Sequence, residues 1–195
     1  MSGAARWKKE QRARLRALRQ GLDPAFKAEA DARIAQSIEE ALPAIASGSF
    51  GFYWPMPDEP DLREAAARWS RAGAKASLPE TVRGAPLTFR PWSPGCTMRA
   101  GIWNIPVPDT AEKAYPAVLL IPCLGFDAKG YRLGFGGGFY DRTLAAMQPR
   151  PLAAGVAYSA CGMQSIRPEA HDIPLDLVVT ERSIVWHQAN RTPNR

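Results

Sequence analysis

Hydrophobic residues recur along the chain at two spacings, which predict helices and short buried strands in alternation. Apolar positions spaced three or four residues apart indicate helices that each bury one face. These segments are residues 5–20, 24–42, 61–71 and 140–147. Short apolar runs bounded by turn residues predict strands at 49–54, 75–78, 87–90, 117–121, 153–157 and 177–179. Strands that alternate with helices favour an α/β fold with a mostly parallel sheet, and we expect residues 1–195 to form a single domain.

A glycine-rich stretch joins one of these strands to one of these helices. Five glycines fall between Gly130 and Gly138, after the apolar run at 117–121. Glycine lets the backbone come close to a ligand, several N–H groups can point at one anion, and a helix N-terminus adds partial positive charge. Arg132 and Arg142 flank the loop with permanent charge and forked donors. The pattern therefore predicts a phosphate-binding loop.

The glycine pattern alone does not identify an enzyme. The loop matches neither G-x-x-x-x-G-K-[ST] nor the dinucleotide-binding pattern, and a plain chain-reversing turn is the alternative interpretation. Asp141 follows the loop directly, where a phosphate-bound Mg²⁺ would take a hard oxygen ligand. The residues themselves thus indicate a phosphate loop with a metal ion.

The positive charge of the chain belongs to its first predicted helix. The chain has 25 Lys and Arg against 19 Asp and Glu, a net charge of +6. Seven basic residues and one acidic residue lie within residues 1–20, so the remaining 18 of each sign balance. Such a helix can be a solvated face, a nucleic-acid contact or a nucleotide contact. The balanced remainder and the lack of a recognised nucleic-acid motif make a nucleic-acid partner the weaker alternative.

Composition places the protein among ordinary soluble proteins. The sequence shows no signal-peptide pattern and no apolar run of the roughly 20 residues that a membrane span needs. Cys96, Cys123 and Cys161 show neither a C-x-x-C pair nor a zinc-binding spacing, which favours reduced thiols. We therefore expect a cytoplasmic monomer without a membrane partner, and a frayed polar tail at 188–195.

The stretch from Gly125 to Arg142 resembles the signature of the 5-formyltetrahydrofolate cyclo-ligases, also called 5,10-methenyltetrahydrofolate synthetases. It reads G-F-D-x-x-G-x-R-L-G-x-G-G-G-F-Y-D-R, and the resemblance extends over nearly the whole chain, from Lys8 to Glu181. It implies a single three-layer α/β/α domain with a glycine-rich phosphate loop. It also implies that ATP and Mg²⁺ are needed to cyclise 5-formyltetrahydrofolate to 5,10-methenyltetrahydrofolate, with release of ADP and phosphate.

The resemblance also assigns residues to ATP and to metal. Lys8 and Arg12 match an N-terminal Lys-x-x-x-Arg pair, and one helical turn places both on the same face. The remaining ATP contacts implied are Arg132, Leu133, Gly134, Phe135, Gly136, Gly137, Gly138, Phe139 and Tyr140. Lys8, Arg132 and Asp141 are the implied catalytic residues, and Asp141 with Asp172 the implied metal ligands. For Asp172 alone, a capping or turn role is the alternative.

The folate contacts implied are Trp54 at the end of a predicted strand and Glu59 in the acidic loop that follows. The loop residues Phe135, Gly136, Gly137, Gly138 and Phe139 complete this set. Aromatic residues that lead into an acidic loop can pack on a flat heterocycle while a carboxylate receives its N–H donors. Core packing with a capping turn is the alternative. Glu59 is therefore a hypothesis for pterin recognition.

The implied mechanism needs no covalent nucleophile. Transfer of the γ-phosphoryl group to the formyl oxygen makes the formyl carbon electrophilic and its oxygen a leaving group. N10 then attacks, and phosphate departs as the ring closes. Phosphoryl transfer asks the protein mainly for positioning and charge neutralisation. His171 and His187 therefore receive no catalytic role.

Two features of the chain depart from the family pattern. Residues 106–108 read Pro-Val-Pro where many members carry Glu-Pro, and the glycine run at 136–138 lacks the lysine of some relatives. The departure at 106–108 keeps open a paralogue that binds another folate without turnover. A nucleic-acid-binding module, suggested by the basic first helix, and a different ATP-dependent kinase are the other rival functions. Arg14, Arg16 and Arg19 gain no role from the resemblance, and we expect them to be solvated.

Overall fold

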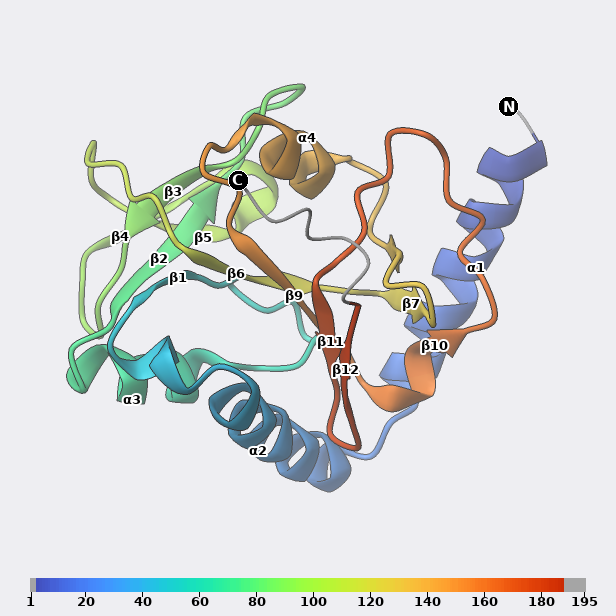
Figure 1. The fold of residues 1–195 in the computed structure, drawn as a ribbon, viewed down its shortest axis with the longest axis horizontal. Coiled ribbons are helices and arrows are strands. Elements are labelled where there is room, and N and C mark those ends of the chain that lie inside the picture. Colours follow the sequence, from blue (N-terminus) through green and yellow to red (C-terminus); the bar gives the residue numbers. More distant parts are fainter. Residues whose placement is uncertain (1–2, 188–195) are drawn as a thin grey trace.

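The computed structural model describes residues 3–187, and a seven-stranded sheet forms its centre (Figure 1). The strand order is β12-β11-β9-β6-β1-β2-β3. Pairs from β11 to β2 are parallel, and only the two outermost pairs are antiparallel. The strands are β1 Ser49–Gly51, β2 Lys75–Glu80, β3 Thr88–Pro91, β6 Val118–Pro122, β9 Leu152–Val156, β11 Leu177–Val179 and β12 Ile184–Trp186. The expected mostly parallel α/β fold is confirmed.

Helices cover both faces of this sheet. They are α1 Gly3–Gln20, α2 Pro24–Ala41, α3 Arg63–Arg71 and α4 Phe139–Ala146, with short 3-10 turns η1 Pro43–Ala46, η2 Ile102–Asn104 and η3 Ser159–Cys161. In Figure 1, α2 and α3 lie on one side of the sheet and α4 on the other, while α1 stands at the end near β7 and β10. None of the helices described is long and apolar enough to span a membrane.

The side chains of β6 alternate between the two faces of the sheet, which explains why helices must pack on both faces. Successive side chains of a strand point to opposite faces. Leu119 packs with Leu144 of α4 in one buried cluster. Leu120, the next residue, lies in the other cluster with Ile34 of α2 and Trp69 of α3. Each fully buried side chain of this size contributes roughly 1.5–3 kcal/mol, so both layers are needed to hold the sheet.

Two smaller sheets extend beyond the central one. β7 Gly125–Asp127 pairs with β8 Arg132–Leu133 and with β10 Gly162–Met163. β4 Met98–Ala100 and β5 Pro106–Pro108 form a hairpin inside the turn-rich stretch. The β7–β8 pair precedes the glycine loop directly, so it fixes where that loop leaves the protein body.

Most predicted elements are present with shifted ends. The strand expected at 49–54 ends at Gly51, although Phe52 N–H still bonds to the Ser77 carbonyl at 3.0 Å. The helix expected from residue 61 begins at Arg63, because the Asp61 carboxylate accepts the Arg63 N–H at 2.9 Å and ends the preceding loop. The sequence did not predict β12, β7, β8, β10 or the β4–β5 hairpin, whose strands have two or three residues each. The tail at 188–195 lies outside the described residues.

Candidate active site

The predicted site residues gather at one edge of the sheet. Parallel strands β1 and β6 end at the same edge, where open α/β sheets bind their ligands. Residues 52–59 follow β1, and the segment that follows β6 contains β7, β8 and then the glycine loop at 134–138. The carboxyl end of the sheet therefore positions the candidate site.

The glycine loop leaves a row of backbone donors without protein partners. Residues 134–138 are bends between β8 and α4, and α4 begins at Phe139. Within residues 3–187, the N–H groups of residues 134–138 donate no hydrogen bond. The first N–H groups of a helix also lack intrahelical acceptors. The loop and the start of α4 thus offer several free donors to an anion.

Glycine is required at two positions of this loop. Gly136 has a φ of +94°, and a Cβ there would lie 3.3 Å from the Arg12 guanidinium carbon. Gly138 has a φ of +63°, and a Cβ there would lie 2.8 Å from a guanidinium nitrogen of Arg142. Both left-handed conformations disfavour side chains. The two arginines therefore approach the loop closely because the glycines leave room.

Arg12 and Arg142 each hold the loop by donating to one of its carbonyls. Arg12 Nε donates to the Gly134 carbonyl at 2.7 Å. Arg142 donates to the Gly137 carbonyl at 2.7 Å and to the Ala85 carbonyl at 3.3 Å. The arginine expected to supply charge at 142 is thus engaged in supporting the backbone, while Arg12 keeps further N–H donors beside the loop.

Lys8 is buried one helical turn before Arg12. It is 7% exposed, and its Nζ lies 3.0 Å from Glu169 Oε2 and 3.1 Å from Asp172 Oδ2. Burial opposes its charge, but the hydrogen bonds that Lys8 donates to these carboxylates outweigh that effect and raise the pKa of Lys8 above its usual value. Lys8 is therefore a fixed positive charge at neutral pH.

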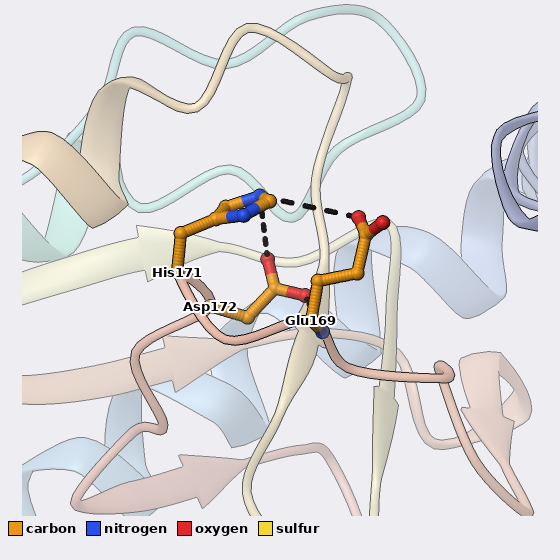
Figure 2. A group of neighbouring side chains, drawn as sticks. All are labelled: Glu169, His171 and Asp172. Carbon is orange, nitrogen blue, oxygen red and sulfur yellow. Dashed lines mark hydrogen bonds and ion pairs between the residues drawn. The ribbon is translucent and has the colours of Figure 1, made fainter. Parts of the chain in front are cut away.

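Asp172 belongs to a small cluster with Glu169 and His171 (Figure 2). Figure 2 shows the His171 ring above the Asp172 carboxylate and beside that of Glu169, and its Nε2 lies 3.8 Å from Asp172 and 4.0 Å from Glu169. Burial acts to raise the pKa of Asp172, but the Glu169 N–H and the Lys8 ammonium that bond to it hold its pKa below the usual value. Asp172 is therefore ionised in the folded protein.

Asp141 is held close to this cluster by main-chain and side-chain bonds. Its Oδ1 accepts the N–H of Ile173 at 3.0 Å and a guanidinium N–H of Arg132 at 2.6 Å. Arg132 also donates to the Ile173 carbonyl at 2.7 Å. Because Ile173 follows Asp172, the two predicted metal ligands lie in one neighbourhood. Arg132 ties Asp141 to the segment that carries Asp172.

Glu59 has one buried oxygen that no group of the described chain satisfies. The residue is 6% exposed, and its Oε2 accepts the Met56 N–H at 2.9 Å. Among residues 3–187, its Oε1 has no hydrogen-bond partner. Burial raises the pKa of Glu59 to about 7. An unpaired buried acceptor is costly, so this atom is poised to receive a donor from a ligand.

Arg19 corrects one prediction from the sequence. It was expected to be solvated, but it is 0% exposed and donates to Asp58 at 3.1 Å and to the Cys123 carbonyl at 3.5 Å. An arginine removed from water needs such partners. The basic residues of α1 therefore differ in exposure. Arg14 and Arg16 are exposed, whereas Lys8 and Arg19 are buried at the edge of the site.

Aromatic residues line the same region. The ring of Phe135 lies beneath the guanidinium carbons of Arg16 at 5.0 Å and Arg19 at 5.8 Å. Burial, followed by the charge of Glu59, raises the pKa of Tyr140, which places this phenol near the acidic loop. Leu133 is 1% exposed and packs in the core, so only its main chain can reach a ligand.

Trp54 has a different neighbour from the other predicted folate contacts. The Arg63 guanidinium carbon lies 5.1 Å from the Trp54 ring centroid, and Arg63 is held by Asp61. Within residues 3–187, no hydrogen bond links Trp54 to Glu59. The structure therefore places both residues in the segment after β1 without joining them.

Trp103 is a candidate ring contact to which the sequence assigned no specific role. It is 61% exposed, and its ring meets that of Phe139 edge-on at 5.9 Å. Its φ is +56° and that of Asn104 is +60°, an unfavourable pair for residues with side chains. An exposed tryptophan held in this strained turn against the glycine loop is a signal that only the three-dimensional structure provides.

Comparison with known proteins gives the same family throughout. A sequence model described as the 5-formyltetrahydrofolate cyclo-ligase family matches residues 4–181. The 5-formyltetrahydrofolate cyclo-ligase of Escherichia coli K12 is 29% identical over 180 residues, covering 88% of this chain and 98% of the relative. That of Haemophilus influenzae is 36% identical over 97 residues, which are 48% of this chain and 52% of the relative.

Solved structures share the fold. An NMR structure of Aquifex aeolicus 5,10-methenyltetrahydrofolate synthetase superposes with a TM-score of 0.80 at 28% identity, covering 96% of both chains. A synthetase from Mycoplasma pneumoniae has a TM-score of 0.72 at 22% identity, covering 89% of this chain and 98% of that one, which bears on the fold alone. With a family match that spans nearly all described residues, the chain belongs to the 5-formyltetrahydrofolate cyclo-ligase family.

Proposed function

We propose that this protein converts 5-formyltetrahydrofolate to 5,10-methenyltetrahydrofolate at the expense of ATP, releasing ADP and phosphate. The observation that carries the proposal is the meeting of three features at one sheet edge. These are the free N–H groups of residues 134–138, the basic pair on α1 and the buried carboxylate of Glu59. The N–H groups and the basic pair suit a polyphosphate, and the Glu59 carboxylate suits a heterocycle with N–H donors.

ATP is the ligand that the loop and α1 suit best. Arg12 donates to the Gly134 carbonyl at the first residue of the loop, and α4 begins at Phe139 directly after the loop. Charge-assisted hydrogen bonds contribute roughly 1.5–3 kcal/mol each, so three or four of them hold a polyphosphate at useful affinity. We assign the loop N–H groups and Arg12 to the phosphates, with Lys8 one turn away.

Mg²⁺ is the metal that the acidic residues fit. Within residues 3–187, Asp141 Oδ2 and Asp172 Oδ1 accept no hydrogen bond, while the other oxygen of each is fixed by neighbouring donors. Hard carboxylate oxygens of this kind suit a cation that also meets phosphate oxygens. Bound there, the ion would neutralise phosphate charge. Asp141 and Asp172 would hold it, and Arg132 and Lys8 keep these carboxylates in place.

The folate ring is assigned to the opposite end of the site. Glu59 Oε1 is the unsatisfied acceptor that pterin N–H donors require. Phe135 belongs to the glycine loop and Tyr140 to the first turn of α4, and we assign both to the ring and its formyl group. Trp54 stays a predicted ring contact, and Trp103 joins it because its indole is exposed beside Phe139.

The chemistry that follows is a phosphoryl transfer and a ring closure. The formyl oxygen attacks the γ-phosphorus, and the bond to ADP breaks. N10 then adds to the activated carbon, loses its proton, and expels phosphate as the C–O bond breaks. The chain supplies positioning and positive charge from Lys8, Arg12 and Arg132, in accordance with the demands of phosphoryl transfer.

The direct test is turnover of the purified protein. Incubation with ATP, Mg²⁺ and 5-formyltetrahydrofolate should produce the longer-wavelength absorbance of the conjugated methenyl product, with one ADP formed per product. ATP hydrolysis without this absorbance would favour a different kinase. Folate binding without ATP consumption would identify a non-catalytic paralogue, and salt-dependent RNA binding alone would favour the nucleic-acid module.

A further inference from the structure

We infer that Glu169 is a positioning residue that holds the Lys8 ammonium in the orientation needed for the nucleotide phosphates. The inference rests on the proposed function, because it assigns Lys8 to ATP. It adds a residue to which neither the glycine motif nor the N-terminal basic pair refers. Glu169 comes from the segment before β11, while Lys8 belongs to α1 at the other end of the chain.

The contacts around the ammonium are specific. Lys8 Nζ lies 3.0 Å from Glu169 Oε2 and 3.1 Å from Asp172 Oδ2. An ammonium group has three N–H donors, so two are used and one is left for a ligand. The Lys8 side chain is 9% exposed and that of Glu169 is 47% exposed. The carboxylate thus holds the buried cation from the solvent side.

Glu169 also keeps Asp172 in place through its own main chain. The Glu169 N–H donates to Asp172 Oδ2 at 2.8 Å, the same oxygen that meets Lys8. Because this bond comes from the backbone, replacing the Glu169 side chain by an amide leaves it intact. The charge on Glu169 can therefore be removed without removing the support for Asp172.

A flexible lysine needs such support more than an arginine does. Its four-carbon stem loses side-chain entropy when the ammonium is fixed, and that loss weakens phosphate binding unless the free protein already restricts it. Arg12, one turn further along α1, is restricted by the Gly134 carbonyl at 2.7 Å. Glu169 provides the corresponding restriction for Lys8, so both cations of α1 are fixed before the nucleotide arrives.

The test compares Glu169→Gln with Glu29→Gln, a matched control. Glu29 forms an exposed ion pair with Arg33 at 2.7 Å on α2, outside the site. We expect Glu169→Gln to raise the KM for ATP, and the Kd for a non-hydrolysable ATP analogue, by about tenfold. The KM for the folate should be unchanged, and Glu29→Gln should match the wild type in every constant. Equal behaviour of the two variants would overturn the inference.

A double variant separates positioning from direct metal or phosphate contact. If Glu169 acts through Lys8, adding Glu169→Gln to Lys8→Ala should weaken ATP binding no further. If the two effects multiply, Glu169 acts independently, and the inference is wrong.

A second measurement does not depend on turnover. Amine-specific labelling followed by mass spectrometry should modify Lys8 more rapidly in Glu169→Gln than in the wild type, with exposed Lys75 as the internal reference. Unchanged labelling of Lys8 would overturn the positioning role even in an active enzyme. Increased labelling in a protein without cyclo-ligase activity would uphold that role and refute only the proposed function.

Discussion

At the scale of a single residue, Glu59 combines a buried oxygen that lacks a partner among residues 3–187 with a pKa raised to about 7 by burial. Replacing it with Gln exchanges one acceptor for a donor at the position assigned to pterin N–H groups. A hydrogen bond to a charged group contributes roughly 1.5–3 kcal/mol, so the KM for the folate should rise about 10- to 100-fold. Steady-state kinetics should show little change in the KM for ATP. Equal effects on both substrates would remove Glu59 from the folate site.

The raised pKa of Glu59 also gives a pH dependence. Burial favours the protonated form, so the carboxylate is ionised only as the pH rises through about 7. Pterin N–H donors need the ionised form, so kcat/KM for the folate should fall progressively below pH 7 and level off above it. A pH profile measured with saturating ATP checks this. The Glu59→Gln variant is the control, and persistence of the same inflection in that variant would contradict the assignment.

The corresponding prediction for the nucleotide end of the site concerns Lys8 and Asp141. Lys8→Ala removes a fixed positive charge and leaves Glu169 and Asp172 without their shared cation. Asp141→Ala removes the carboxylate that Arg132 and the Ile173 N–H hold in place. Each change should lower kcat/KM by about 10²-fold or more, on the order of 3 kcal/mol. Near-normal turnover of either variant would exclude that residue from the site.

Individual residues also show what the sequence could and could not predict. Lys8 and Arg12 were identified through the resemblance to the family's N-terminal Lys-x-x-x-Arg pair, and Gly136 and Gly138 because a glycine run before a helix predicts a phosphate-binding loop. The partners of Lys8 could not be found in this way, since Glu169 lies 161 positions away. Arg19 was misassigned because a basic stripe on a helix gives no sign that one of its members is covered by Asp58.

At the scale of an element, the glycine loop depends on its left-handed positions. Gly138 is the N-cap of α4 at a φ of +63°, and Gly138→Ala adds both backbone strain and a contact with Arg142. A strained position of this kind costs on the order of 1–3 kcal/mol, and here it moves the N–H groups assigned to phosphate. We expect the KM for ATP to rise at least tenfold.

Gly73 provides a matched control for this variant. It has a φ of +114°, follows α3, and has open space where a Cβ would lie. Gly73→Ala should lower the melting temperature through backbone strain while leaving the KM for ATP at the wild-type value. An equal change in KM for both variants would show that strain acts through general destabilisation and not through the loop.

The contact between α2 and Tyr158, the residue before η3, gives a second prediction at the scale of an element. Tyr158 donates to Asp31 Oδ1 at 2.9 Å, and burial raises the pKa of Asp31 to about 6. Because the folded state binds the proton more tightly than the unfolded state, stability falls as the pH rises from about 4 through 6. Asp31→Asn keeps an acceptor oxygen and removes the charge. Calorimetry at pH 5 and pH 8 should therefore show a smaller decrease in melting temperature for the variant than for the wild type.

Elements differed in how well the sequence predicted them. The long amphipathic helices and the apolar strand at 177–179 were predicted closely, because burial on one or both faces sets their pattern. β7, β8 and the β4–β5 hairpin were missed, because each of these strands contains a charged residue or proline and so lacks the continuous apolar run of 177–179. β2 continues through Pro79 into Glu80, where the antiparallel partner β3 holds it, although proline usually marks a strand end.

At the scale of the whole molecule, the two ligands are assigned to loops that leave the same sheet edge from different strands. The acidic loop follows β1, and the glycine loop follows β8 in the segment after β6, the strand that pairs directly with β1. Binding of either ligand to the folded state alone stabilises the entire domain, by about 2.7 kcal/mol at a hundred times Kd. ATP analogue with Mg²⁺ should therefore raise the melting temperature of the wild type, and much less that of Lys8→Ala. Equal shifts for both would place the nucleotide elsewhere.

The distribution of charge supports the same arrangement. The net charge of +6 lies in residues 1–20, and α1 places Lys8, Arg12 and Arg19 against the site while other arginines remain exposed. Net charge itself predicts attraction of anions and not their identity. The monomeric state, like the absence of a nucleic-acid partner, stays a prediction from the sequence.

The central claim is that the main-chain N–H groups of residues 134–138 hold the terminal phosphates of ATP. A crystal structure with a non-hydrolysable ATP analogue and Mg²⁺ tests it most directly. We predict the β- and γ-phosphates within hydrogen-bonding distance of these N–H groups, with Arg12 beside them and the metal ion on Asp141 or Asp172. A bound nucleotide that leaves these N–H groups in contact with solvent would contradict the account.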